Sequence, residues 1–490
     1  MVRPTPRHLL PGAAAFAAAL VVGLLGFNAG ADEPPPSVAP DDGPVELQLL
    51  GVNDFHGHLE PPEPGLGGAA WLGAHLNEAA RSHPDRTIRV HAGDMIGASP
   101  LISSHFHDEP TIEATNMMGF DVGAVGNHEF DEGGEELLRV LQGSRYPWLA
   151  ANTVDPQTGA TLLPPYQVIE RAGVRVGFIG VTTDDTPTWL LPEFKRDHRF
   201  LDISDTVNRW VPELRSRGVE AIVVLAHSGA FQKGAVREGA GRPAPERPHL
   251  AAGEITDETA EMDDAVDVVI AGHTHSQLNL SVDGKLVVES FAYGTGYDRV
   301  RIGVDHVTGD VVSKSAELVA TTHAGTAPDP ELASHVAEYA SRVAPLGERV
   351  VGELDEELDS DELGELVADA QRAYAGADVA FVNGGNTRRP GMDAGEVSYA
   401  EAFLVHVYEH PIVRMTMRGS DVLAVWRARG PVDLHESGLD TVRPDGTYTV
   451  AANAVLAVGR RFGAFERGWD AARIGTDLEA LVAWLGRDER

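Results

Sequence analysis

The segment GNHEFD, residues 126–131, carries one amide, one imidazole and two carboxylates within six positions. A folded protein gains little stability from such a cluster unless the cluster binds something, because polar groups lose their hydration on burial. The side chains of Asn127, His128 and Asp131 can bind a metal ion or transfer a proton. This segment is therefore the first candidate for a functional site.

Four other segments share this arrangement, because each places Asp or His directly after a short apolar run. They read NDFHGH, GD, HSG and GHTHS. One His of this kind is usually structural, but five segments with polar side chains at the same relative position indicate a shared site. The candidate side chains are those of Asp54, His56, Asp94, Asn127, His128, Asp131, His227, His273 and His275.

The apolar runs before these segments are short and mostly rich in β-branched residues, which is typical of buried strands. Helical patterns lie between several of them, for example at residues 67–82 and 205–218. Strands that alternate with helices predict an α/β domain, in which ligands bind beyond the carboxyl ends of the strands. We therefore expect the five segments to meet in space. The predicted strands cover residues 45–52, 87–92, 121–125, 221–226 and 266–271.

The candidate donors are oxygen and imidazole atoms without thiolate, a set that suits Zn²⁺, Mn²⁺, Fe, Co²⁺ or Ni²⁺. They include too many His for a Ca²⁺ or Mg²⁺ site built from oxygens, and they outnumber the ligands of one tetrahedral ion. Two ions with a bridging carboxylate fit better, and Asp94 is the natural bridge. Two such ions can activate a water and neutralise the oxygens of a phosphoryl group. His128 is adjacent to a predicted ligand and should face the substrate instead, with Asp131 orienting its imidazole.

The length of 490 residues predicts two or more domains. The strand-and-loop pattern ends near residue 325, so residues 45–325 are expected to form the first domain. Residues 326–345 are expected to form a connecting helix, and residues 346–490 a second α/β domain. Helices are predicted there at 361–376 and 472–490, and strands near 377–383, 412–418 and 448–459.

The first residues resemble an export signal. Arg3 and Arg7 precede an apolar run at residues 13–27, and small residues follow. We expect a cleaved signal peptide over residues 1–31, a Pro-rich linker over 32–44 and a secreted or extracytoplasmic protein, with an uncleaved anchor as the alternative. Elsewhere no apolar stretch suggests a membrane span.

The chain is strongly acidic, with a formal net charge of −35, and it contains no Cys. This charge argues against nucleic acid as a partner, because phosphate backbones need a basic surface. Bound cations could still attract a small anionic substrate, since metal ions dominate the field of their site.

The strings DFH, GD, GNHEFD, AHSG and GHTHS, in this order, resemble the calcineurin-like metallophosphoesterases. The fuller strings NDFHGHL, GDMIGAS and NMMGFDVGAVGNHEFD are similar to the 5′-nucleotidase branch, which includes UDP-sugar hydrolases and 2′,3′-cyclic phosphodiesterases. The resemblance implies a four-layer α/β/β/α catalytic domain with a dinuclear metal centre, followed by a smaller α/β domain that binds the nucleotide. It implies one ion held by Asp54, His56, Asp94 and His275, a second held by Asp94, Asn127, His227 and His273, and a catalytic pair of His128 and Asp131.

The second domain matches this family less closely. NGGNTR, residues 383–388, is similar to the family's Asn-Gly-Gly-Gly-x-Arg motif, so Asn383, Gly385 and Arg388 are expected to contact the substrate. The stretch LDSDELGELVADA lacks the Arg that the family carries there. VGRRFGAF, residues 458–465, replaces the family's Gly-Gly-Asp-Gly and base-stacking aromatic. We expect Phe462 or Phe465 to stack on the base, and Arg460 or Arg461 to replace the missing cation.

These observations predict an exported phosphoesterase that uses two divalent ions of Mn, Zn, Co or Fe and hydrolyses nucleotide phosphomonoesters by attack of a metal-bound hydroxide. Its expected partner is a nucleotide or another small phosphoester. Two alternatives stay open. One is a 2′,3′-cyclic nucleotide phosphodiesterase or UDP-sugar hydrolase on the same centre, and the other is a catalytically silent surface binding protein.

Overall fold

The computed structural model describes residues 43–191, 193–232, 251–383, 391–428, 434–457 and 462–487, which belong to one compact unit. Among these residues, no helix has the length and apolar character needed to cross a membrane. The predicted signal peptide and nearly all of the predicted linker lie outside the described residues.

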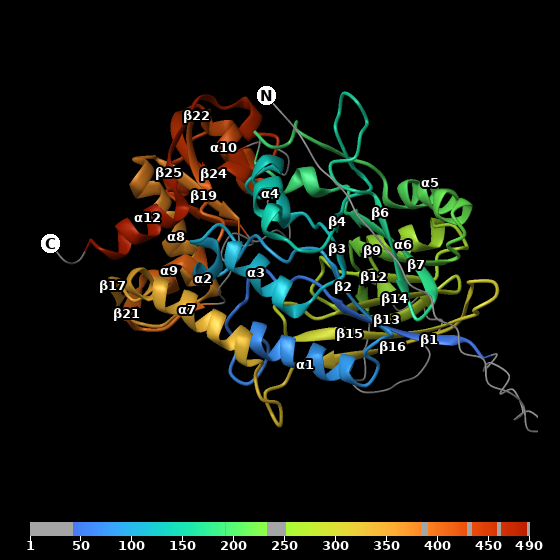
Figure 1. Ribbon diagram of the computed structural model, residues 1–490. Helices are drawn as coiled ribbons and strands as arrows, with labels where there is room; N and C mark the ends of the chain where they lie inside the picture. The colour runs from blue at the N-terminus through green and yellow to red at the C-terminus, as the bar shows by residue number, and fades with distance from the viewer. Residues whose placement is uncertain are drawn as a thin grey trace, which may run out of the picture. The chain divides into compact units, whose positions relative to one another are not determined.

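The first described sheet has six strands in the order β16-β15-β1-β2-β3-β4 (Figure 1). Strands β1 to β4 run parallel, and β15 and β16 extend the sheet antiparallel. The bounds are β1 Val45–Val52, β2 Thr87–Ala92, β3 Val122–Ala124, β4 Trp148–Leu149, β15 Gly296–Val304 and β16 Val311–Ala320.

The second described sheet has the order β13-β14-β12-β9-β7-β6. Its four central strands run parallel and its two edge strands run antiparallel. The bounds are β6 Tyr166–Arg171, β7 Val174–Thr182, β9 Ala221–His227, β12 Val268–Ala271, β13 Gln277–Val282 and β14 Lys285–Ser290.

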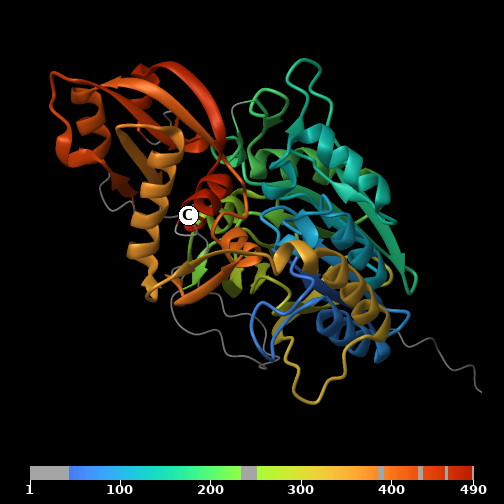
Figure 2. The ribbon, with the colours of Figure 1, turned by 90° about the vertical axis from the view of Figure 1, so that its left-hand side faces the viewer.

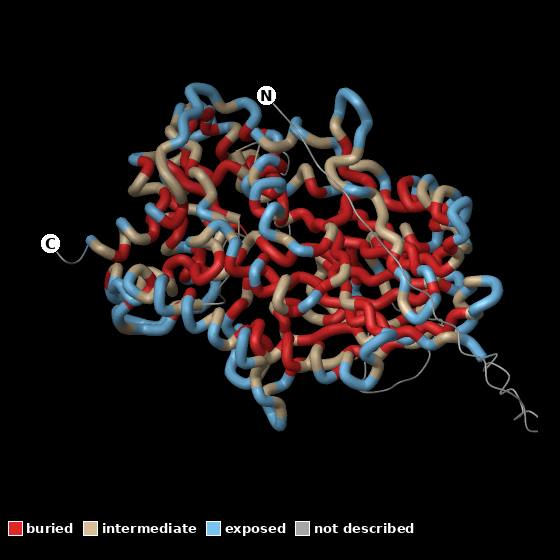
Figure 3. Tube along the Cα trace, in the orientation of Figure 1, coloured by how far each residue is buried: buried red, intermediate tan, exposed pale blue. Residues whose placement is uncertain are grey.

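The two sheets pack face to face because alternate side chains of each strand point in opposite directions. On β1, Leu47 and Leu49 belong to the core between the sheets, whereas Leu50 and Val52 face the helices. Figure 3 shows the strands of both sheets mostly in the colour of buried residues. Helices cover the outer face of each sheet, so the predicted α/β/β/α layering is confirmed.

The first sheet is covered by α1 (Ala69–Arg81), α3 (Glu109–Met118) and α7 (Pro330–Gly347), which share one core cluster with β1. The second sheet is covered by α5 (Ile203–Ser216) and α6 (Glu254–Glu261). Shorter elements of this region are α2 Leu101–Ser104, α4 Gly134–Val140, β5 Thr153–Val154, β8 Arg199–Phe200, β10 Phe231–Gln232 and β11 Ala251–Ala252, and the 3-10 helices η1 His128–Phe130, η2 Leu141–Gly143 and η3 Thr186–Thr188.

The described C-terminal residues form a five-stranded sheet in the order β23-β19-β24-β22-β25, drawn in orange and red in Figure 2. Its strands are β19 Val379–Asn383, β22 Pro411–Arg418, β23 Leu434–Ser437, β24 Thr447–Asn453 and β25 Trp469–Thr476. The other elements are α8 Ser360–Ala375, α9 Tyr399–Val405, α10 Gly419–Arg427, α11 Ala454–Ala457, α12 Asp477–Leu485, β17 Val350–Leu354, β18 Leu358–Asp359, β20 Gly391–Met392, β21 Gly395–Ser398, η6 Leu439–Thr441 and η7 Phe465–Arg467.

Most predicted elements occur within a few residues of their predicted places, but the C-terminal helix is shorter than predicted. Residues 472–476 complete strand β25, and the helix begins at Asp477, where Thr476 and Glu479 form a capping box. The acidic stretch that lacks the family's Arg also has a local role, because the carboxylate of Asp359 accepts N–H bonds from Asp361 and Glu362 at the start of α8.

Candidate metal centre

The predicted metal ligands come from the carboxyl ends of five strands in the two sheets. Asp54 and His56 follow β1, Asp94 follows β2 and Asn127 follows β3 in the first sheet. His227 ends β9 in the second sheet, and His273 and His275 follow the neighbouring β12. The parallel pairings β1–β2–β3 and β9–β12 bring these ends together at one edge of the sandwich.

Five of these residues have a positive φ angle, which residues other than glycine rarely adopt. The φ angles are 50° at Asp54, 48° at His56, 48° at Asp94, 77° at His273 and 52° at His275. Such conformations cost free energy, and they persist where the surrounding structure imposes them, most often at functional sites. The strained backbone of these loops is therefore consistent with a functional site.

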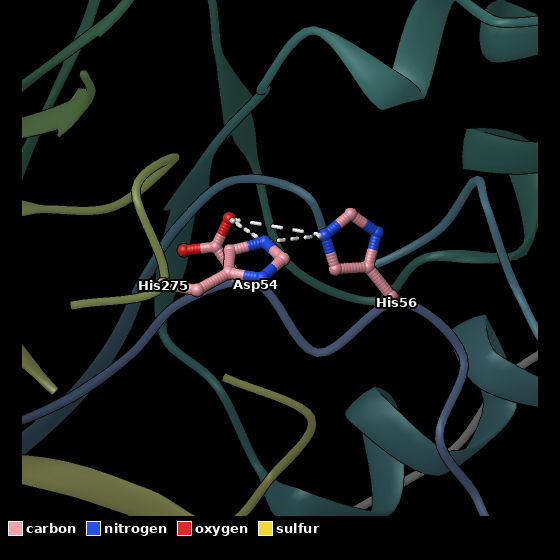
Figure 4. Close-up of side chains that lie close together, drawn as sticks. All are labelled: Asp54, His56 and His275. Carbon is pink, nitrogen blue, oxygen red and sulfur yellow. Dashed lines mark hydrogen bonds and ion pairs between the residues drawn. The ribbon is translucent and has the colours of Figure 1, made fainter. Parts of the chain in front are cut away.

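The first cluster consists of Asp54, His56 and His275 (Figure 4). The Nε2 atoms of the two imidazoles lie 3.2 Å apart. Oδ1 of Asp54 lies 3.3 Å from Nε2 of His275 and 3.8 Å from Nε2 of His56. Burial raises the pKa of Asp54, but the hydrogen bond and charge of His275 outweigh it and lower that pKa to about 2.

The second cluster consists of Asp94, His227 and His273. Nε2 of His227 lies 2.9 Å from Oδ2 of Asp94 and 3.1 Å from Oδ1 of Asn127. The same Oδ2 atom lies 3.7 Å from Nε2 of His56 in the first cluster. Asp94 therefore stands between the two clusters, as a bridging carboxylate must.

Backbone carbonyls fix the orientation of two candidate imidazole ligands. Nδ1 of His56 lies 2.8 Å from the carbonyl oxygen of Gly97, and Nδ1 of His227 lies 2.9 Å from that of Ala92. Each Nδ1 must carry the proton in order to donate it, so each Nε2 lone pair is directed into the cluster. Imidazoles that bind metals are usually held in this way.

The electrostatics of the clusters favour bound positive charge. Burial lowers the pKa of His227, but Asp94 outweighs this effect and raises it to about 10, so Nε2 holds a proton that a metal ion would displace on binding. Burial and His227 lower the pKa of His273 to about 4, so its imidazole is neutral, as a ligand must be. Two groups of imidazole and carboxylate donors that share one carboxylate match the donor set of a pair of divalent transition-metal ions.

The predicted catalytic pair lies beside these clusters. Nδ1 of His128 donates to Oδ2 of Asp131 over 2.8 Å, within the turn that begins at η1. The backbone N–H of His128 donates to Oδ1 of Asp94 over 2.9 Å, which fixes the pair relative to the second cluster. The ring centroids of His128 and His56 lie 5.1 Å apart.

A cavity opens next to His128, and residues from both parts of the chain line it. Asp131 and Trp189 belong to the N-terminal part, whereas Tyr408 and His410 come from the loop between α9 and β22. The Tyr408 ring is stacked on that of His128, with centroids 5.5 Å apart and planes 18° apart.

Family models match both parts of the chain. The model "Calcineurin-like phosphoesterase" matches residues 47–277, and "5′-nucleotidase, C-terminal domain" matches residues 341–439. The chain belongs to the 5′-nucleotidase family of metallophosphoesterases. The predicted family membership is therefore confirmed.

Two curated relatives are similar in sequence, and one solved structure is similar in fold. The chain is 32% identical to "Endonuclease YhcR" of Bacillus subtilis over 84% of its own length and 37% of that protein. It is 33% identical to "Cell wall protein Lmo0130" of Listeria monocytogenes over 77% of its length and 55% of that protein. It thus spans between a third and somewhat over half of these relatives. The crystal structure of a 5′-nucleotidase precursor from Thermus thermophilus has the same fold, with a TM-score of 0.73, 23% identity and coverage of 90% of this chain and 96% of that one.

The structure gives less support to the predicted substrate-binding residues than to the predicted metal ligands. Oδ1 of Asn383 accepts a hydrogen bond from Asn453 over 2.9 Å at the end of β19. Gly385, Arg388, Arg460 and Arg461 lie outside the described residues. Phe462 and Phe465 are each 2% exposed and pack in the C-terminal core, so the expectation that one of them stacks on a base is wrong for this structure.

Two buried carboxylates that support the clusters had no predicted role. Glu129 accepts hydrogen bonds from the backbone N–H groups of Asp94, Met95, Ile96 and Gly126, which holds the loop after β2. Burial and the charge of Asp94 raise its pKa to about 8, although the four N–H donors favour its ionised form. The sequence did contain a signal for this residue, because Glu129 is a second carboxylate within the polar segment GNHEFD.

Glu289, at the end of β14, holds the loop that carries His273 and His275. Its carboxylate accepts from the hydroxyl of Thr274 over 2.8 Å and from the backbone N–H of Ser276 over 3.0 Å. Burial and Asp54 raise the pKa of Glu289 to about 8. No sequence pattern indicated this contact.

Proposed function

We propose that this chain hydrolyses nucleotide phosphomonoesters in the manner of a 5′-nucleotidase. One observation carries the proposal: two imidazole–carboxylate clusters meet at Asp94, and the His128–Asp131 pair lies directly beside them. A site of this kind suits phosphoryl transfer, where catalysis is mainly positioning and charge stabilisation.

Each predicted ligand has a place in this proposal. Asp54, His56 and His275 would hold one divalent ion, and Asn127, His227 and His273 would hold the other, with Asp94 shared. Mn, Zn, Co or Fe would suit these donors. Ions bound there would supply positive charge for the phosphoryl oxygens and lower the pKa of a water.

The chain's own catalytic step belongs to His128. Asp131 accepts a hydrogen bond from the Nδ1–H group of His128, and its negative charge stabilises an imidazolium there. The Nε2–H of that imidazolium can donate to a phosphoryl oxygen or to the departing ester oxygen as negative charge develops there. The hydrogen bond from the His128 backbone to Asp94 keeps this donor beside the clusters.

A phosphodiester substrate is the second candidate. One curated relative is named an endonuclease, and another, 30% identical over 210 residues, is named 2′,3′-cyclic-nucleotide 2′-phosphodiesterase/3′-nucleotidase. The same two clusters would serve this reaction, because the charge that must be stabilised is again on phosphoryl oxygens.

A substrate panel separates these possibilities. Purified protein loaded with Mn²⁺, Co²⁺ or Zn²⁺ is offered AMP, UDP-glucose, 2′,3′-cyclic AMP, an aryl phosphate and a short DNA. We expect the highest kcat/KM with AMP, and loss of turnover in Asp94→Asn and His128→Ala. Preference for cyclic AMP or DNA would favour the diesterase, and no turnover with any metal would favour a silent binding protein.

Export is part of this proposal, and the basic and apolar pattern of residues 1–31 supports it. Expression of the full chain followed by N-terminal sequencing of the extracytoplasmic protein tests it. A mature N-terminus near residue 32 is expected, and retention of residues 1–31 in a membrane pellet would indicate an anchor instead.

A further inference from the structure

An exposed indole lies beside the second cluster. Trp189 follows η3 and is 53% exposed. Its ring centroid lies 6.4 Å from that of His273, with the planes 69° apart. It also lines the cavity that His128 and Tyr408 line. A molecule that fills this cavity next to His128 would therefore reach the indole.

Exposure alone would not distinguish this residue, because single exposed apolar side chains are common. Eight large apolar side chains in the described residues are well exposed, and Trp189 is the member of that group that lines the cavity. Trp469 is 41% exposed as well, but it lies on β25 and does not line the cavity. The feature that distinguishes Trp189 is therefore its position at the cavity, not its exposure.

The backbone that carries Trp189 is fixed to the strand end that carries His227. The N–H of Thr183 donates to the carbonyl of His227 over 2.9 Å, and the hydroxyl of Thr186 donates to the carbonyl of Thr183 over 2.7 Å. The N–H of Trp189 then donates to the carbonyl of Thr186 over 3.0 Å. Three successive contacts therefore fix the backbone at Trp189 relative to His227.

On the far side, the same segment is tied to the C-terminal part of the chain. The guanidinium of Arg473 on β25 lies 2.5 and 2.7 Å from the two carboxylate oxygens of Glu193. The backbone on both sides of Trp189 is therefore anchored, so less of the chain has to be ordered when a ligand contacts the indole.

We propose that Trp189 is a specificity-determining residue whose indole stacks on the base of a nucleotide while the phosphate occupies the metal centre. The inference rests on the hydrolysis of nucleotide phosphomonoesters proposed above and adds to it a residue that recognises the aromatic base. Base–aromatic stacking tolerates any base, because each base presents a π-face. The residue would therefore select nucleotides over sugar phosphates without selecting one nucleobase strongly.

The decisive comparison uses AMP and ribose 5-phosphate, which differ by the base alone. Trp189→Ala is expected to raise the KM for AMP by roughly tenfold, the size of one lost base stack, and to leave kcat within about twofold. The KM for ribose 5-phosphate should stay unchanged. Trp189→Phe should restore most of the lost affinity, and Trp469→Ala should behave as the unsubstituted protein. Equal changes for both substrates, or no change for either, would overturn the inference.

A binding measurement keeps this test independent of turnover. A non-hydrolysable phosphonate analogue of AMP is titrated into the metal-loaded protein while tryptophan fluorescence is recorded. We expect a change that disappears in Trp189→Phe and persists in Trp469→Phe. If neither AMP nor ribose 5-phosphate is hydrolysed, the proposed function fails, and this titration alone decides on Trp189. A signal that survives in Trp189→Phe would exclude the stack.

Discussion

Oδ2 of Asp94 lies 2.9 Å from Nε2 of His227, and both side chains are almost completely buried. A buried carboxylate is stable only when a positive charge compensates it, and here that charge comes from a protonated His227 or from a bound cation. Asp94 also faces His56 of the other cluster, so this carboxylate can act on both metal positions.

Substitution of Asp94 by Asn should therefore affect both metal positions together. The variant keeps the size of the side chain but removes the negative charge that two ions would share. We expect elemental analysis to show two equivalents of metal per chain in the unsubstituted protein and less than one in Asp94→Asn. Asp85→Asn, at an exposed loop position, is the matched control and should keep both equivalents. Unchanged metal content in Asp94→Asn would contradict the bridging role.

Loss of His128 should affect turnover without affecting metal content, because His128 is not among the cluster donors. We expect His128→Ala to lower kcat by about 10²- to 10⁴-fold, the usual contribution of a positioned proton donor. Asp131→Asn should have a smaller effect. The double variant should be no slower than His128→Ala, since Asp131 acts through His128. Additive losses in steady-state assays with AMP would mean that Asp131 acts separately.

Much of the site could be predicted because each candidate ligand follows a strand that can be recognised locally. Residues 45–52 and 87–92 are strands in the structure with the predicted bounds, and Asp54 and Asp94 follow them. Parallel strands carry their carboxyl ends to one edge, so convergence follows from topology rather than from side-chain detail.

Contacts that depend on packing could not be predicted in the same way. Glu289 reaches the loop of His273 and His275 only because β14 pairs with β12 in a particular register. Tyr408 meets His128 only because a loop of the C-terminal part lies over the first part. The resemblance placed Phe462 near the family's base-stacking aromatic, whereas its side chain here completes a core.

Glu129→Gln should weaken both the fold and the metal centre. Gln can present one oxygen, but its NH₂ group would face backbone N–H donors that Glu129 now satisfies. Leaving such donors unpaired costs about 1–3 kcal/mol of unfolding free energy. Urea unfolding and metal titration would measure the two effects. Glu135→Gln, at an exposed position of α4, should change stability by less than about 0.5 kcal/mol.

Gly126 is required by close packing of the candidate ligands around it. A Cβ atom there would lie 2.2 Å from Oδ1 of Asp94 and 2.7 Å from the ring of His227. We expect Gly126→Ala to lower metal affinity by roughly 10- to 100-fold, as other changes next to metal ligands do. Gly143→Ala, whose Cβ would meet only Ile112 at 3.5 Å, should bind metal normally. Competition with a chelator would separate the two variants, and equal affinities would show that the ligands adjust without loss.

His91 should make the stability of the protein depend on pH. Its ring is completely buried among Phe120, Tyr146 and Trp148, and burial lowers its pKa to about 3. The unfolded chain binds a proton at His91 below about pH 6.5, whereas the folded chain does not until about pH 3. Its contribution to stability is therefore fully present above about pH 6.5 and is lost progressively as the pH falls toward 3.

The variant His91→Gln isolates this effect, because Gln is uncharged at every pH and can still form a hydrogen bond with the hydroxyl of Tyr146, which lies 3.2 Å from Nε2 of His91. We expect the unsubstituted protein to lose about 2 kcal/mol more unfolding free energy than the variant between about pH 7.5 and pH 5. Urea unfolding of both proteins in the presence of a chelator, at several pH values, would measure the difference free of metal release. Parallel curves would mean that water reaches the ring in the folded state and that the imidazole titrates there as it does in the unfolded chain.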